Sequence, residues 1–281
     1  MRVVVTGSKG FTGHHLMSLL AKKAFDALPL TSDLTDAQAV LDEMQHLKPE
    51  VVIHLAGLTY VPTADDIETY RVNSIGSDNL LKACKAQAKT IKKVILGSSS
   101  NVYGRTAGLL DEATPPAPIN HYGCSKLAME FIAKTYQDFF EVVITRPFNY
   151  TGVGQGIQFL LAKIVDHFAR QAPVIHLGNT EIARDFSDVR WIAEAYVHLA
   201  QNTDARGIYN LCSSQATSIR NIIEILSTLT GHNIDIVVDQ NLVRSNDIAY
   251  QVGSNKRLCS TFNIPPIPLT QTFEWMLEHH R

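Results

Sequence analysis

The first half of the chain alternates short apolar runs with longer amphipathic stretches. The runs at 2–6 and 51–56 have the length of buried strands, and the segment 11–25 between them repeats apolar residues at helical spacing. Leu16 and Leu20 lie on one face of that helix. Strands that alternate with helices in this way are typical of a parallel α/β sheet.

The pattern continues to residue 147 and then becomes less regular. Further strands are expected at 94–98 and 142–146, and further helices at about 66–87 and 122–140. In the second half, helices are expected at 158–170, 191–201, 219–230 and 271–279, and strands at 174–177, 208–211 and 234–238. This order predicts a Rossmann-type, doubly wound parallel sheet that carries a smaller α/β substrate-binding lobe.

Composition excludes several classes of protein. The 281 residues are 45% hydrophobic and 19% charged, as in ordinary globular proteins. Lys and Arg number 25 against 27 Asp and Glu, so a net charge of -2 provides no basic surface for nucleic acid or a membrane. Four widely spaced cysteines, none in a CxxC pair, indicate free thiols rather than a zinc site. The chain shows neither a signal peptide nor a membrane-spanning run, so a cytoplasmic protein is expected.

A glycine loop joins the first strand to the first helix. Gly7, Gly10 and Gly13 form a GxxGxxG pattern, a variant of the dinucleotide-binding fingerprint. These glycines permit a tight turn, a close approach of the backbone to a pyrophosphate, and close packing of helix on strand. The N-terminus of the following helix offers unpaired N–H groups to the phosphates. A glycine-rich turn without a ligand is the alternative, but its place after the first strand favours nucleotide binding.

The end of the second strand bears on the choice of dinucleotide. An acidic residue there would bind the ribose diol of NAD, but Leu30–Ser32 offers no carboxylate. Asp33 and Leu34 follow and are expected to contact the adenine. With no acid to repel a 2′-phosphate and with Lys9 nearby, NADP is the expected cofactor and NAD the alternative.

A tyrosine and a lysine at helical spacing provide the candidate catalytic group. Tyr122 and Lys126 share one helix face, and a neighbouring ammonium lowers the pKa of a tyrosine from its usual value of about 10. Ser98–Ser100 follows a strand whose carboxyl end opens on the crevice of such a sheet. Taken alone, the pair could be incidental; the glycine loop, the serines and the pair in this order favour catalysis.

These motifs resemble the extended short-chain dehydrogenase/reductase family over nearly the whole chain. The similar segments are TGSKGFTG at 6–13, HLAG at 54–57, SSSNVYG at 98–104, YGCSK at 122–126 and RPFNYTG at 146–152. The resemblance implies that Ser99 hydrogen-bonds the substrate oxygen, that Tyr122 transfers the proton, and that Lys126 holds the nicotinamide ribose and tunes Tyr122. It implies cofactor contacts from Gly7, Lys9, Gly10, Phe11, Thr12, Gly13, Asp33, Leu34, Leu55, Ala56, Gly57, Tyr122, Lys126 and Pro147.

The resemblance extends to the organisation of the chain. The expected dinucleotide-binding domain comprises residues 1–156 and about 185–204, and the nucleotide-sugar lobe comprises about 157–184 and 205–281. Asn73 matches a family asparagine that is associated with the active-site backbone, whereas most members have proline at the position of His121. A homodimer is implied, formed through the helix at about 66–87 and the helix that carries Tyr122.

The family contains dehydratases, epimerases and reductases of nucleotide sugars. Dehydratases have a glutamate, often beside an aspartate, where this chain has Ser100 and Asn101. Neither side chain can take a proton from carbon, which argues against dehydration, and the sequence offers no comparable base for a dedicated 3,5-epimerase. Reduction of a keto group needs only the serine, the tyrosine and the lysine, and is the reaction that remains.

Longer segments are similar to the branch of GDP-4-keto-6-deoxy-mannose reductases. They are VVIHLAGLTYVPTA at 51–64, RPFNYTGVGQG at 146–156, RDFSDV at 184–189, YNLCSSQATSIRNIIEIL at 209–226 and LVRSNDIAYQVGSNKRL at 242–258. Arg184 and Arg244 match family residues that meet the nucleotide sugar, and an arginine fork suits a diphosphate. Tyr60, Ser100 and Asn149 are the other expected substrate contacts. The implied substrate is a GDP-sugar of the mannose or the manno-heptose type.

Two other functions stay open from the sequence. A nucleotide-sugar 4-epimerase uses the same three residues and would retain tightly bound NAD. A non-catalytic NADP-binding regulator commonly lacks the tyrosine or the lysine, and both are present here. No metal is expected, because His14, His15 and the other histidines have no acidic or cysteine partner at ligand spacing.

Overall fold

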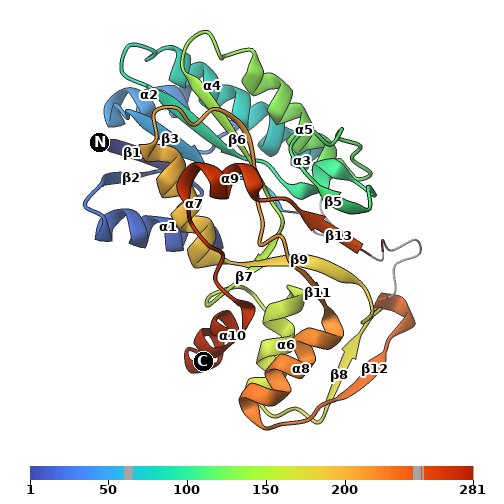
Figure 1. Ribbon diagram of the computed structural model, residues 1–281. Coiled ribbons are helices and arrows are strands. Elements are labelled where there is room, and N and C mark those ends of the chain that lie inside the picture. Colours follow the sequence, from blue (N-terminus) through green and yellow to red (C-terminus); the bar gives the residue numbers. More distant parts are fainter. Residues whose placement is uncertain (60–65, 243–247, 249, 281) are drawn as a thin grey trace.

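Six parallel strands form the central sheet in the computed structural model, which describes residues 1–59, 66–242, 248 and 250–280 (Figure 1). The strands follow the order β2-β1-β3-β4-β6-β10. Their bounds are Arg2–Thr6 for β1, Asp26–Leu30 for β2, Val51–His54 for β3, Lys93–Gly97 for β4, Glu141–Pro147 for β6 and Gly207–Leu211 for β10. The strand order reverses between β1 and β3, so the sheet is doubly wound and the predicted Rossmann-type α/β class is confirmed.

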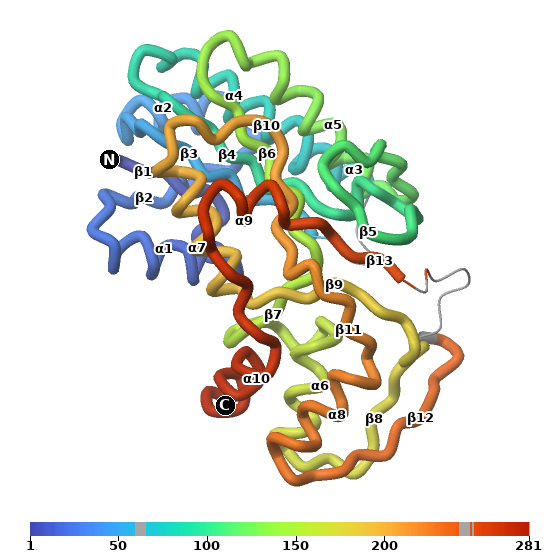
Figure 2. Tube along the Cα trace, in the orientation of Figure 1, coloured from blue at the N-terminus to red at the C-terminus, as the bar shows by residue number. Residues whose placement is uncertain are grey.

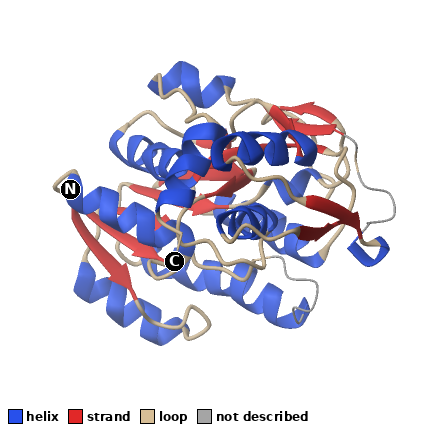
Figure 3. Cartoon of the chain, turned by 90° about the horizontal axis from the view of Figure 1, so that it is seen from below, coloured by secondary structure: helices blue, strands red, loops and turns tan. Residues whose placement is uncertain are grey.

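Helices cover both faces of this sheet, and the alternation of side chains along each strand decides which face a residue joins. Val3 and Val5 pack in one buried cluster with Leu16, whereas Val4 between them packs in another with Met44. Seen from below, the strands lie between the two helical layers (Figure 3). The helices are α1 Phe11–Lys22 and α7 Val189–Gln201 on the first face, and α2 Ala37–Leu47, α4 Ser77–Lys85 and α5 His121–Lys134 on the second.

The helix expected at about 66–87 is present as three consecutive elements. They are α3 Asp66–Tyr70, a π-helical turn η1 Arg71–Gly76, and α4. A π turn inserts one residue into a helix and is frequent at functional sites. The inserted turn contains Asn73, whose side chain is directed toward the end of β3 and α5.

The second half of the chain contributes a smaller lobe below the central sheet (Figure 1). Its own apolar core joins Phe168, Leu226 and Phe273, one from each of three helices. The lobe contains α6 Leu160–Ala169, the parallel strands β8 Val174–Leu177 and β12 Asp235–Val238, α8 Ile219–Thr230, the short turn η3 Gln240–Leu242 and α10 Leu269–Glu278. No helix in the described part of the chain combines the length and the apolarity needed to cross a membrane.

A second sheet joins the lobe to the larger part of the molecule (Figure 2). Its strands are β5 Gly108–Leu110, β7 Asn149–Thr151, β9 Ala183–Asp188, β11 Ala216–Ser218 and β13 Tyr250–Gly253. The buried carboxylate of Asp185 in β9 accepts hydrogen bonds from the N–H groups of Ser213, Ser214 and Gly253, at 2.7, 2.9 and 3.3 Å. Burial raises the pKa of Asp185 to about 6, and these donors oppose the rise. Because β7 directly follows β6, this sheet links the lobe to the end of a central strand.

Several elements differ from the sequence-based expectation, which contained neither α2, nor α9 Lys256–Phe262, nor the strands β7, β9, β11 and β13 of the second sheet. Strand β10 pairs with β6 at the edge of the central sheet, although it lies in the segment 205–281 that the sequence analysis assigns to the lobe. Tyr209 and Leu211 are buried in the same cluster as α1 and α7, which explains this placement. Strand β5 was not expected, because three residues cannot display an alternating pattern and the strand depends on pairing with β13.

Candidate active site

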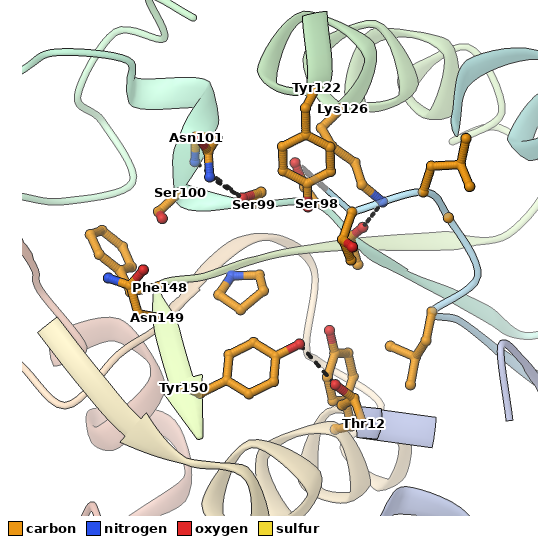
Figure 4. Close-up of a pocket in the computed structure, with 17 residues that line it drawn as sticks. Thr12, Ser98, Ser99, Ser100, Asn101, Tyr122, Lys126, Phe148, Asn149 and Tyr150 are labelled. Carbon is orange, nitrogen blue, oxygen red and sulfur yellow. Dashed lines mark hydrogen bonds between the residues drawn. The ribbon is translucent and has the colours of Figure 1, made fainter. Parts of the chain in front are cut away.

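A cavity of about 130 Å³ opens at the carboxyl ends of β3, β4 and β6, beside the start of α1 (Figure 4). Ligands bind in this crevice in open α/β sheets, at the point where the strand order reverses. The cavity brings together predicted residues from five distant segments of the chain. They are Thr12, Leu55, Gly57, Ser99, Ser100, Tyr122, Lys126, Pro147 and Asn149.

The glycine loop is shaped to hold an anionic group. Gly7 has a φ of +67°, and a Cβ there would lie 2.6 Å from the backbone nitrogen of Ala56, so only glycine fits between β1 and β3. A Cβ on Gly13 would lie 2.1 Å from the carbonyl oxygen of Gly7, which allows α1 to begin directly against the loop. The N-cap Gly10 provides no side-chain cap, and the first turn of α1 contains no acid. The N–H groups at this end are therefore available to a pyrophosphate, and the residues fit a bound dinucleotide.

Tyr122 and Lys126 lie in the first two turns of α5 and face the cavity (Figure 4). The helix begins here because the side chain of Asn120 accepts a hydrogen bond from the N–H of Gly123 at 2.7 Å. Burial raises the pKa of Tyr122 to about 12, while a hydrogen bond with Ser99 opposes the rise. Burial lowers the pKa of Lys126 to about 8, and the charge of Glu130 opposes that fall. The ammonium of Lys126 donates to the carbonyl of Gly97 at 2.8 Å, at the end of β4.

Ser99 follows β4 and caps a short 3-10 helix, η2 Ser100–Tyr103. Its Oγ accepts hydrogen bonds from the backbone N–H and the side-chain Nδ2 of Asn101, at 3.1 Å each. These two donors occupy the acceptor positions of the hydroxyl, so its proton is directed to Tyr122 or to a substrate oxygen. The structure therefore brings the three predicted catalytic residues into one constellation.

Asn73 connects the π turn to both walls of the cavity. Its Oδ1 accepts from the N–H of Leu58 at 2.8 Å, and its Nδ2 donates to the carbonyl of Leu58 at 3.0 Å and to Ser125 Oγ at 3.1 Å. The hydroxyl of Ser125 in turn donates to the carbonyl of Tyr122 at 2.8 Å. Asn73 thus fixes the segment after β3 relative to the helix that carries Tyr122.

His54 lies at the end of β3, behind the cavity wall, and completes a second chain of hydrogen bonds. Its Nδ1 meets Thr6 Oγ1 at 2.7 Å, and its Nε2 meets Ser77 Oγ at 2.8 Å. Ser77 Oγ donates to the carbonyl of Asn73, so it accepts a hydrogen bond from the N–H at Nε2 of His54. Thr6 Oγ1 accepts a hydrogen bond from the N–H of Ala56 and donates one to Nδ1 of His54. Burial lowers the pKa of His54 to about 3, which keeps this histidine neutral.

A buried ion pair supports the serine loop from below. Glu130 on α5 accepts two hydrogen bonds from Arg146 of β6, at 3.0 and 2.7 Å, and one from Ser98 Oγ at 2.6 Å. The guanidinium of Arg146 lies 4.8 Å from the ring centre of Tyr103, whose hydroxyl donates to Asn210 at 2.7 Å. Through these contacts, Ser98 is tied to β6 and to β10.

Tyr150 forms the wall opposite Tyr122 (Figure 4). Its hydroxyl lies 2.8 Å from Thr12 Oγ1 at the start of α1, and its ring stacks on Phe11 with centroids 6.0 Å apart. Burial raises the pKa of Tyr150, and the bond with Thr12 opposes the rise. This pair joins the glycine loop to the strand that leads into the lobe.

Several predicted contacts lie elsewhere. The guanidinium of Arg184 donates to the carbonyl groups of Ala183 and Ile248, at 2.9 and 2.5 Å, and Arg184 is not part of the cavity wall described above. Tyr60 and Arg244 lie outside the described residues. The predicted adenine contact Asp33 accepts from the N–H and the hydroxyl of Thr35 at 2.9 and 2.8 Å, in the loop after β2. Leu34, the second predicted adenine contact, is buried against α2 and α4. Lys9 is exposed on the glycine loop.

Sequence reasoning missed His54, Glu130, Arg146 and Tyr150 as parts of the site. The first three are buried polar residues at strand ends or one helical turn from Lys126, which is the signal that could have found them. His121, at the position where most family members have proline, begins α5 as an ordinary helical residue and lies 3.3 Å from Asp66. Within the described ranges, no cluster of three His, Cys, Asp or Glu side chains is arranged to hold a metal ion.

The fold and this constellation are those of a dinucleotide-dependent short-chain dehydrogenase/reductase of the extended type. Residues 3–212 match the NAD dependent epimerase/dehydratase family, and the chain belongs to it.

Two curated relatives cover most of the chain. A GDP-6-deoxy-D-talose 4-dehydrogenase from Aggregatibacter actinomycetemcomitans is 34% identical over 92% of this chain and 90% of its own length. A GDP-6-deoxy-D-mannose reductase from Pseudomonas aeruginosa is 35% identical over 94% of this chain and 92% of its own. Among solved structures, that of RMD from Pseudomonas aeruginosa complexed with NADPH superposes with a TM-score of 0.90, at 34% identity, over 99% of this chain and 96% of the other.

Proposed function

We propose that this protein is an oxidoreductase that reduces the C4 keto group of a GDP-4-keto-6-deoxy-sugar with NADPH, or alternatively with NADH. The observation that carries the proposal is the cavity in which Ser99, Tyr122 and Lys126 converge beside the uncapped start of α1. The two relatives that act on GDP-6-deoxy sugars support the substrate class. The related structure complexed with NADPH supports the cofactor.

Ser99, Tyr122 and Lys126 each have a task in this reaction. The nicotinamide supplies a hydride when it is bound. Tyr122 donates its phenolic proton to the C4 oxygen, and Ser99 donates a hydrogen bond to the same oxygen. Burial holds the pKa of Tyr122 at about 12, so the phenol is protonated before the reaction, as a proton donor must be. Lys126 carries the positive charge that stabilises the tyrosinate left behind.

The residues beside Ser99 support reduction in place of dehydration. The amide of Asn101 is engaged with Ser99 Oγ, and Ser100 lines the cavity with a hydroxyl. Neither can remove a proton from a sugar carbon at neutral pH. The cavity therefore offers Tyr122 as a proton donor beside Ser99 but no carboxylate base there, which suits a keto reduction.

The wall opposite Tyr122 bears on the stereochemistry of the product. The 6-deoxy-mannose and 6-deoxy-talose products of the two relatives differ in configuration at C4, so the face of C4 that receives the hydride decides which sugar is made. Tyr150 and Asn149 lie on this wall, and Asn149 is held there by its bond to the carbonyl of Asp185 at 3.0 Å. A hexose and a manno-heptose differ beyond C5, so both remain substrates of the proposed class.

The proposal includes the arrangement of the molecule. We assign residues 1–156 and about 185–204, together with strand β10 of the central sheet, to dinucleotide binding, and the rest, with Arg184 and Arg244, to the GDP-sugar. We place a homodimer interface on α3–α4 and α5, where Ile75 and Phe131 expose apolar side chains. We place the reaction in the cytoplasm. Light scattering of wild type and Phe131→Glu tests the dimer, and a monomeric wild type would refute it.

The decisive experiment couples the protein to a GDP-mannose 4,6-dehydratase, so that the keto sugar is made in place. A parallel reaction uses the corresponding GDP-heptose. Oxidation of NADPH or NADH with either sugar, and a 6-deoxy product whose C4 configuration is read by NMR, is the expected result. No oxidation with either sugar, together with NAD retained through purification, would instead identify a 4-epimerase.

A further inference from the structure

The carboxylate of Glu43 reaches from α2 to the end of β2. It accepts hydrogen bonds from the N–H and the hydroxyl of Thr31, at 3.0 and 2.9 Å. It also accepts from the N–H and the hydroxyl of Ser32, at 2.7 and 2.5 Å. Burial acts to raise its pKa, but these four donors outweigh burial and lower the pKa of Glu43. The group is therefore an ionised carboxylate held in a fixed place.

That place is next to the glycine loop. Leu30, the last residue of β2, pairs with Thr6 of β1, which directly precedes Gly7. In a doubly wound sheet, a dinucleotide on this loop sets its adenosine ribose at the end of the second strand. Thr31 and Ser32 therefore lie where the ribose 2′ position is expected, and the sequence offers no acid within this segment. The structure supplies one from a helix that lies further along the chain.

A carboxylate at this position acts differently on the two dinucleotides. A ribose 2′-hydroxyl can donate a hydrogen bond to it, as to the usual acid at the end of β2. A 2′-phosphate carries up to two negative charges and is repelled. The four donors that could bind a phosphate are also already engaged by Glu43.

The surrounding cations offset this repulsion only in part. Arg71 donates two hydrogen bonds to the carboxylate of Glu68, at 2.6 and 2.8 Å. Asp33 adds a further negative charge to the loop after β2. Lys9 is exposed on the glycine loop, and it forms no ion pair with any residue of the described ranges. Among the residues described, Lys9 is a cation that is available to a 2′-phosphate.

We propose that Glu43 is a cofactor-specificity residue that lowers the preference of the enzyme for NADPH over NADH. The inference rests on the dinucleotide binding in the proposed function and does not depend on the sugar. It corrects the sequence-based argument that no carboxylate opposes a 2′-phosphate, while it leaves both cofactors usable.

The test compares wild type with Glu43→Gln, which removes the charge and keeps the size of the side chain. NADPH and NADH are titrated separately into the full-length protein without sugar, and binding is followed by nicotinamide fluorescence. The ratio of the Kd for NADH to the Kd for NADPH is expected to rise about tenfold in the variant. Asp42→Asn is the matched control, because Asp42 lies on the same helix and accepts instead from Gln38 at 2.8 Å. Its ratio is expected to change less than about twofold.

If Glu43 had a structural role only, its substitution would weaken the binding of NADPH and of NADH by the same factor. An unchanged ratio of the two Kd values therefore overturns the proposal. If Glu43→Gln does not fold, Glu43→Ala is titrated with adenosine 2′,5′-bisphosphate and with adenosine 5′-monophosphate, which report the same ratio without a nicotinamide. If the wild type binds both cofactors but reduces no GDP-sugar, the proposed sugar substrate is refuted and the proposed role of Glu43 is not. A wild type that binds neither dinucleotide overturns both.

Discussion

Replacing Lys126 with methionine should abolish activity and at the same time stabilise the protein. The side chain is 5% exposed, and burial lowers its pKa from 10.5 to about 8. That difference corresponds to a penalty of about 3 kcal/mol against the charged form in the folded state. Methionine fills a similar volume without charge but leaves the carbonyl of Gly97 without its donor, at a cost of about 1 kcal/mol. The expected net gain is about 2 kcal/mol in the free energy of unfolding at neutral pH.

The pH dependence of this gain has a definite sign. Below pH 8 the lysine is charged in both states, and the folded protein bears the full penalty. Between pH 8 and 10.5 the unfolded chain binds more protons than the folded one, so the stability of the wild type rises with pH and the penalty disappears. The advantage of Lys126→Met should therefore shrink across this window. Lys134→Met, on the exposed side of the same helix, should show no such trend.

Urea unfolding of the three proteins at about pH 7 and about pH 10 measures these differences. Turnover of Lys126→Met with the coupled keto sugar should fall by at least about a hundredfold. A variant less stable than the wild type at neutral pH would refute the reasoning. So would a stability difference that does not change with pH, since the penalty would then not arise from the charge of Lys126.

Three further experiments test other parts of the site. Tyr122→Phe removes the proton donor, so turnover should fall about a thousandfold while the variant still binds NADPH in fluorescence titration; full activity would exclude the role. Glu130→Gln leaves Arg146 buried without its counter-charge, and urea unfolding should show a loss of about 3–5 kcal/mol, against no more than about 0.5 kcal/mol for the surface variant Glu278→Gln. Tyr150→Phe and Thr12→Val each remove the hydrogen bond between these two side chains, so their double-mutant cycle on cofactor affinity should show a coupling of about 1 kcal/mol. Strict additivity of the two effects would contradict a role of this hydrogen bond in cofactor binding.

The parts of the site that sequence reasoning could predict are those fixed by local geometry. The glycine loop is one turn between a strand and a helix, and the spacing of Tyr122 and Lys126 places both on one helix face whatever the rest of the chain does. The segment Ser98–Ser100 was predictable because it follows a strand whose carboxyl end faces the crevice, and the family resemblance selected Ser99 within it. Each of these depends on a few consecutive residues, and the structure places all three around one cavity.

The contacts that sequence reasoning missed depend on tertiary packing. Glu43 reaches Thr31 only because α2 packs back on β2, so the sequence of the strand end alone did not reveal this carboxylate. The ion pair of Glu130 and Arg146 joins a helix to the following strand, and β5 exists through its pairing with β13. No periodicity in the sequence encodes such a partner, because the pattern of apolar residues specifies a face and not the neighbour that covers it.

The buried polar groups around the cavity leave the positive charge at one position. His54 is kept neutral by burial and by hydrogen bonds that fix its tautomer, and Arg146 is neutralised by Glu130. Lys126 forms no ion pair with a carboxylate among the residues described, and its ammonium donates to the carbonyl of Gly97. A buried cation without a counter-ion costs stability, but its field is strongest where water and carboxylates are excluded. In the proposed reaction, that field would stabilise Tyr122, one helical turn away, once the phenol has lost its proton; the stability that Lys126→Met is expected to recover is therefore what the charge costs the fold.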